Sequence, residues 1–177
     1  NEAAGTHFFS GFAHLINAMR SCSKLIIGRM HGKAVGGGVG IACACDYTLA
    51  TKNAAIKLSE LAIGIGPFVI EPAVSRKIGK TAMSEMTLAA QEWKSADWAF
   101  AKGLYANTFD SIEALDIAIT DFSSKLSSYN PEALIEMKKV LWEGTQHWEA
   151  LLLERAAISG KLVLSDFTKK ALLQFKK

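Results

Sequence analysis

Three consecutive glycines, at positions 36–38, and a later carboxylate, Glu60, are the residues of this chain whose types and spacing indicate chemistry. The glycines follow an apolar segment typical of a buried strand, residues 24–30, and precede small apolar residues typical of a buried helix, 39–45. A helix that begins there leaves its first N–H groups unpaired, and glycine lets a ligand oxygen approach them closely. These residues predict a site for an oxyanion or a developing enolate. The alternative is that the glycines only allow close packing of a strand against a helix.

Other glycine, histidine and cysteine residues do not form a known binding motif. Residues 79–81 (GKT) lack the earlier glycine of a phosphate-binding loop because Val74 stands there. The four histidines lack the HExxH spacing of a metal site. Cys43 and Cys45 are separated by one residue and lie, like Cys22, among apolar residues, so we expect reduced core thiols. No metal and no permanently bound cofactor is predicted.

From residue 24 to the C-terminal helices, the sequence resembles the crotonase (enoyl-CoA hydratase/isomerase) superfamily. The resemblance is carried by HGKAVGGGVGIACACDYTLAT (31–51), IKLSELAIGIGP (56–67) and RKIGK (76–80), and the GGGVG and LSE variants are most similar to the methylglutaconyl-CoA hydratase type. It implies an α/β fold, a crotonase-type spiral of ββα repeats over residues 1–110, followed by a helical region, 111–177, used in trimerisation. It also implies a substrate carried as a coenzyme A thioester and a homotrimer or dimer of trimers.

The resemblance also implies roles for single residues. In the superfamily, the middle glycine of the triplet supplies one of two N–H groups that hold the thioester oxygen, which implies this role for Gly37. The carboxylate after the next strand is a general acid/base, which implies this role for Glu60. Residues that contact the CoA phosphates remain unassigned. Four further residues are expected to line the substrate site: Gly36, Gly40, Pro67 and Phe68.

One departure from the superfamily pattern concerns the reaction. Hydratases commonly carry a second catalytic glutamate where this chain has Gly40. Addition of water needs a base for the water and a proton for the α-carbon, so Glu60 must do both or another acid must enter. Glu71 is the nearest candidate, and the alternative is a first-turn acid that complements a helix dipole. The predicted activity is hydration of a 2-enoyl-CoA; the alternatives are a double-bond isomerase and a non-catalytic acyl-CoA-binding or assembly subunit.

A second departure concerns the front of the superfamily fold, which carries the other oxyanion N–H group and much of the CoA adenine pocket. This chain instead opens with a predicted amphipathic helix, and we expect a truncated product or completion by another chain. Further helices are predicted over 72–79, from Thr81 and from Ser95, and an extended segment over 104–109. Later helices are predicted over 131–144 and 148–158, the last with a broad apolar face suited to subunit packing or to burial within the chain.

Composition predicts one compact domain. The chain has 177 residues, 50% of them hydrophobic, which is enough for one sizeable core. The formal net charge of +3 is small and no basic run is interleaved with aromatic residues, so a nucleic-acid partner is not expected. No segment has the length and apolarity of a membrane span or the pattern of a secretory signal. We expect a cytoplasmic protein of a bacterium or, if a targeting segment is missing, of the mitochondrial matrix.

Overall fold

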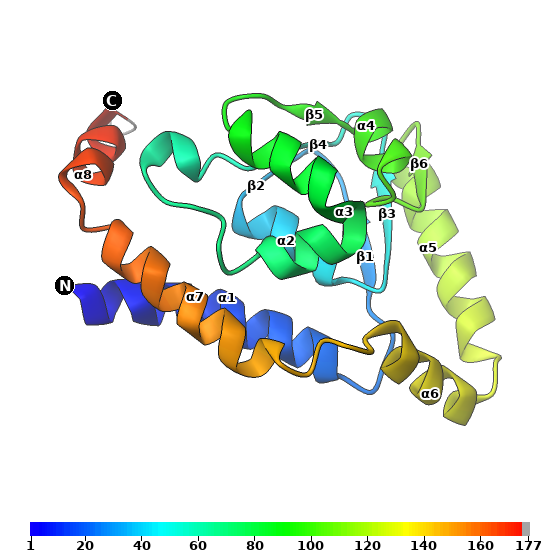
Figure 1. Cartoon of the computed structure of the whole chain (residues 1–177). Coiled ribbons are helices and arrows are strands. Elements are labelled where there is room, and N and C mark those ends of the chain that lie inside the picture. The colour runs from blue at the N-terminus through cyan, green and yellow to red at the C-terminus, as the bar shows by residue number, and fades with distance from the viewer. Residues whose placement is uncertain (175–177) are drawn as a thin grey trace.

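The structure, a computed structural model, describes residues 1–174, in which short strands alternate with helices up to Phe109 and helices follow (Figure 1). The strands are β1 (Ile27–Met30), β2 (Lys33–Val35), β3 (Tyr47–Thr51), β4 (Ala55–Lys57), β5 (Lys94–Ser95) and β6 (Asn107–Phe109). The α-helices are α1 (Glu2–Ser21), α2 (Gly37–Ala44), α3 (Glu71–Leu88), α4 (Ala96–Ala101), α5 (Ile112–Ser127), α6 (Pro131–Leu141), α7 (Trp148–Leu162) and α8 (Asp166–Leu173). A short 3-10 helix, η1 (Leu61–Ile63), precedes α3. Residues 175–177 of the predicted helical region lie outside the described residues.

The first four strands alternate between two sheets, and this makes the chain climb as a spiral. β1, β3 and β6 form one parallel sheet in that order, with Gly28 opposite Thr48. β2, β4 and β5 form the other, in which Val35 of β2 lies opposite Lys57 of parallel β4 and β5 is antiparallel. Two turns of two strands and a helix follow one another, β1-β2-α2 and β3-β4-α3. The predicted α/β spiral of ββα repeats is confirmed.

The helices predicted around the glycines occur, with one break inside α3. α2 begins at Gly37 rather than at residue 39 and is buried, and α3 packs against it. α3 joins the two predicted helices 72–79 and 81 onward, with Gly79 at φ +81° between them. That conformation is open to glycine at little cost, which is why the helix bends there.

The amphipathic helix predicted at the start is α1, and it lies along α7 (Figure 1). The two helices approach closely through glycines, since a Cβ on Gly5 would lie 2.8 Å from the backbone oxygen of Gly160. Part of the apolar face of residues 148–158 is buried within the chain, namely Trp148, Leu152 and Ala156. Leu153 and Ile158 remain exposed. No helix among residues 1–174 has the length and apolarity needed to cross a bilayer.

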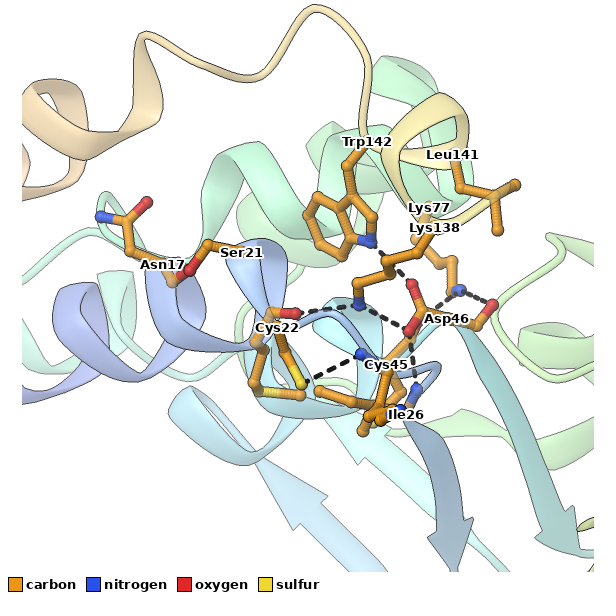
Figure 2. A network of polar contacts seen from close by, with 12 residues as sticks. Asn17, Ser21, Cys22, Ile26, Cys45, Asp46, Lys77, Lys138, Leu141 and Trp142 are labelled. Atoms are coloured by element: carbon orange, nitrogen blue, oxygen red, sulfur yellow. Dashed lines mark hydrogen bonds and ion pairs between the residues drawn. The ribbon is translucent and has the colours of Figure 1, made fainter. Parts of the chain in front are cut away.

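A buried ion pair joins α6 to the spiral (Figure 2). Lys138 Nζ lies 2.7 Å from Asp46 Oδ2, and both side chains are 3% exposed. Lys138 also donates to the backbone oxygen of Met19 at 2.9 Å. The carboxylate of Asp46 accepts two further bonds, from Trp142 Nε1 at 2.6 Å and from the Ile26 N–H at 2.7 Å. The charges are therefore paired and hydrogen-bonded, which is the condition for burying them.

The same cluster closes the C-terminal end of α2. Lys77 of α3 donates from Nζ to the backbone oxygens of Cys45 at 2.7 Å and Asp46 at 3.1 Å. A cation there satisfies carbonyl groups at the end of the helix and complements its dipole. Cys43 and Cys45 are buried free thiols, as predicted, and burial raises the pKa of Cys43 to about 12. Side chains therefore hold the C-terminal end of α2 in place. The glycines lie at its N-terminal end.

Candidate active site

The N-terminal end of α2 presents backbone N–H groups, as the glycines predict. Gly36 has φ +55°, its N–H donates to the backbone oxygen of Lys57, and its own carbonyl accepts from Val39 and Gly40. Within residues 1–174, the N–H groups of Gly37 and of its neighbour at position 38 have no acceptor. They are the first donors of the helix and lie at the positive end of its dipole, so they suit an anionic oxygen.

Glu60 lies beside these N–H groups, after β4 and immediately before η1. A Cβ on Gly36 would lie 2.7 Å from Glu60 Oε1, so glycine is required there both for its positive φ and for the approach of the carboxyl group. Glu60 Oε2 is buried and has no hydrogen-bond partner among the described residues. Burial raises the pKa of Glu60, an effect that its own backbone N–H opposes. The group therefore holds a proton more readily than an exposed glutamate.

A pocket of about 40 Å³ encloses Glu60 and Gly37, which is room for a few water molecules rather than an acyl chain. Predicted residues Pro67 and Phe68 line it, and so does Ile70. Sequence reasoning missed Phe9, Phe12 and Ser159, which also line the pocket. Helical periodicity marks the two phenylalanines only as core positions, and Ser159 lies just beyond the helix predicted over 148–158. Phe9 and Phe12 come from α1, and Ser159 comes from α7. The packing of these two helices brings the three residues over the glycines.

Gly36 and Gly40 are predicted to line the substrate site, but in the structure they lie behind residues that line the Glu60 pocket. Gly36 contacts Glu60, and Gly40 contacts Ile70. A Cβ on Gly40 would lie only 2.4 Å from Ile70 Cγ2, so Ile70 takes the space in which a side chain at position 40 would begin. The wall of the pocket on that side is therefore hydrocarbon, with no second carboxylate.

Glu71, the candidate second acid, does not line the Glu60 pocket. It is the first residue of α3 and accepts from Ser75 Oγ at 2.5 Å, from Lys80 Nζ at 2.7 Å and from Arg155 Nη1. Burial alone would raise its pKa, but the bonds from Lys80, Ser75 and Arg155 lower it to about 2. Glu71 is thus an ionised, paired carboxylate, neither a proton donor for this pocket nor an exposed first-turn acid.

The fold and the pocket together define an α/β spiral protein in which helix N–H groups face one buried carboxyl group. A sequence model described as enoyl-CoA hydratase/isomerase matches residues 1–175. The chain belongs to the enoyl-CoA hydratase/isomerase family, the crotonase superfamily predicted from its motifs.

Relatives within this family include both hydratases and isomerases. The chain is 31% identical over 124 residues to 2,3-dehydroadipyl-CoA hydratase of Escherichia coli, covering 70% of this chain and 48% of that protein. It is 26% identical over 138 residues to the mitochondrial Delta(3,5)-Delta(2,4)-dienoyl-CoA isomerase of Homo sapiens, covering 77% and 42%. A crystal structure of an enoyl-CoA hydratase from Mycobacterium avium superposes with a TM-score of 0.90 at 23% identity, covering 99% of this chain and 68% of that one. The chain spans less than half the length of these two curated relatives.

Proposed function

We propose that this chain is an enoyl-CoA hydratase that adds water reversibly to a 2-enoyl-CoA thioester, with methylglutaconyl-CoA as one candidate substrate. The observation that supports it is the buried Glu60 carboxyl group beside the free N–H group of Gly37. Hydratases among the relatives support the same activity, at 31% identity in Escherichia coli and 32% in Clostridium acetobutylicum.

In the proposed reaction the Gly37 N–H donates to the thioester oxygen and stabilises the enolate that forms as the nucleophile adds. Glu60, as the carboxylate, takes a proton from water while the hydroxyl group bonds to the β-carbon. The protonated Glu60 then returns that proton to the α-carbon, so the two hydrogens and the oxygen of one water end on the product. Apolar side chains such as Phe68 and Ile70 exclude other water from this exchange.

The proposal includes assembly as a homotrimer or a dimer of trimers through residues 111–177. Several large apolar side chains of this region stay exposed and support it, among them Ile117, Val140 and Leu153. Large apolar side chains that a subunit leaves exposed are candidates for a subunit contact.

A double-bond isomerase is the second candidate, and the contact of Gly40 with Ile70 favours it. With hydrocarbon on that wall, Glu60 is the one carboxyl group that residues 1–174 place in the pocket. A single group can remove a proton from one carbon and return it to another, which is all that a shift of a double bond requires. Hydration requires the same group also to remove a proton from the attacking water.

Product mass in oxygen-18 water distinguishes the two candidates. If the chain is a hydratase, crotonyl-CoA or 3-methylglutaconyl-CoA should yield a 3-hydroxyacyl-CoA that carries the label. An isomerase would convert a 3-enoyl-CoA without any label. Absence of label with both 2-enoyl thioesters, in protein that binds them, would overturn the hydratase proposal.

We expect the space between Gly40 and Ile70 to control whether a second carboxylate can enter. Gly40→Glu alone should destabilise the chain by about 1–3 kcal/mol, because the new side chain overlaps Ile70. Gly40→Glu combined with Ile70→Ala should lose less than the sum of the two single variants, by about 1 kcal/mol or more, and should hydrate crotonyl-CoA at least about 10-fold faster than Ile70→Ala. Urea unfolding and product formation measure both effects. Additive losses with unchanged hydration would contradict the expectation.

A further inference from the structure

A second cavity, of about 520 Å³, lies next to the Glu60 pocket and is large enough for an acyl group. The two share one wall, made by Gly66, Pro67 and Phe68. The larger cavity therefore lies on the other side of the short loop that lines the small pocket.

Its lining combines hydrocarbon with polar groups. Leu61, Met83, Leu88 and Ile158 supply apolar surface, which suits the methylene or methyl groups of an acyl chain. Two hydroxyl groups, three charged side chains and the shared loop complete the lining: Ser84, Thr87, Glu71, Lys80, Arg155 and residues 66–68. A cavity for a wholly apolar chain would not need these charges.

Among residues 1–174, the charges that line this cavity leave one cation without a counter-charge. Glu71 is paired with both Lys80 and Arg155, so two positive groups face one carboxylate. Arg155 uses only Nη1, which donates to Glu71 and, at 3.3 Å, to the backbone oxygen of Phe68. Its Nε and Nη2 have no acceptor within residues 1–174, although its side chain is only 28% exposed. A partly buried guanidinium with free N–H groups is well suited to bind a carboxylate.

We propose that this cavity receives the distal part of the acyl group and that Arg155, with Lys80 at the rim, binds a carboxylate at its end. The preferred substrate is then a 2-enoyl-CoA with a second carboxylate, rather than a neutral one of similar length. This inference rests on the proposed function, because it places the reacting carbons beside Glu60 and the free carboxylate beyond Phe68. The ion pair with Glu71 holds the guanidinium group of Arg155 in place, and the free N–H groups of Arg155 bind the carboxylate of the substrate.

Calorimetric binding to the 177-residue chain tests this, in a Glu60→Gln background that should bind thioesters without turnover. The ligands are glutaconyl-CoA, which ends in a carboxylate, and crotonyl-CoA, which does not. Glutaconyl-CoA should bind at least about 10-fold more tightly, because only this ligand accepts a charge-assisted hydrogen bond from Arg155. Arg155→Leu should bring the ratio of the two Kd values close to one, and Arg155→Lys should keep part of it. Arg20→Leu, which removes a cation outside both cavities, should leave the ratio intact.

The possible outcomes test three separate claims: the carboxylate site, the role of Arg155 and the proposed function. Equal Kd values for the two thioesters before any change at Arg155 would overturn the carboxylate site, whether or not the Arg155→Leu variant folds. A preference that survives Arg155→Leu in folded protein would overturn the role of Arg155. Failure of both thioesters to bind would overturn the proposed function itself, and with it this site.

Discussion

Replacement of Glu60 by glutamine should lower turnover of a 2-enoyl-CoA thioester by about 10²- to 10⁴-fold, because glutamine keeps the size of the side chain but does not exchange protons at the reacting carbons. The pocket offers no substitute. Its other lining groups are backbone, hydrocarbon and the hydroxyl of Ser159, and the carboxylate of Glu71 lies outside it with a pKa of about 2. Steady-state rates measure the loss, and the Kd of the thioester should change little because the Gly37 N–H remains. Turnover above about one tenth of the original would contradict a role in proton transfer.

Stability across pH is the control that separates this loss from misfolding. Burial raises the pKa of Glu60, so the folded chain binds this proton more tightly than the unfolded chain does. Stability therefore falls as pH rises from the ordinary pKa of glutamate through the raised one, since folding then opposes ionisation. Glu60→Gln removes that penalty and should be more stable than the original chain at about pH 8. The difference should shrink near about pH 4, and a less stable variant at the higher pH would contradict the assigned burial.

Lys138→Met should lower the free energy of unfolding by about 3–5 kcal/mol, the largest effect on stability that we expect. The substitution leaves the carboxylate of Asp46 buried without its ion partner and leaves the backbone oxygen of Met19 without its donor (Figure 2). Asp46→Asn should be costly for the opposite reason, because it leaves a buried ammonium group facing a neutral amide. Urea unfolding followed by tryptophan fluorescence is a suitable measurement, since Trp142 donates to Asp46.

The neighbouring lysine provides a matched control for this prediction. Lys139 pairs with Glu136 at 2.6 Å, but both side chains are about two-thirds exposed, at 66% and 68%. Lys139→Met should therefore change stability by no more than about 0.5 kcal/mol. The double variant Asp46→Asn with Lys138→Met should cost less than the sum of its parts, because neither residue then leaves an unpaired charge. Equal effects of Lys138→Met and Lys139→Met would show that the buried pair adds little.

At β1 and β6, local sequence patterns do not predict where the strand begins. The apolar run 24–30 predicts one strand, yet β1 begins only at Ile27 because the Ile26 N–H donates to the Asp46 side chain instead of to the sheet. The extended segment predicted over 104–109 contributes only β6, since the N–H of Leu104 bonds to the backbone oxygen of Ala99 in the turn after α4. In both places a group outside the sheet takes a hydrogen bond that periodicity assigns to a strand.

The α/β spiral follows from the resemblance to the superfamily, whereas a helix next to the glycines and the placing of Glu60 after a strand follow from local patterns in the sequence. They depend on interactions within a few residues: helix and strand periodicity, the conformational freedom of glycine at a turn, and the unpaired N–H groups of a helix start. The packing of the folded chain determines the rest of the site. Ile70 fills the space beside Gly40, Phe12 of α1 covers the glycines, and Arg155 of α7 pairs with Glu71 from 84 positions away. Such contacts arise from the packing of separate elements, and no local pattern in the chain encodes which side chains will meet.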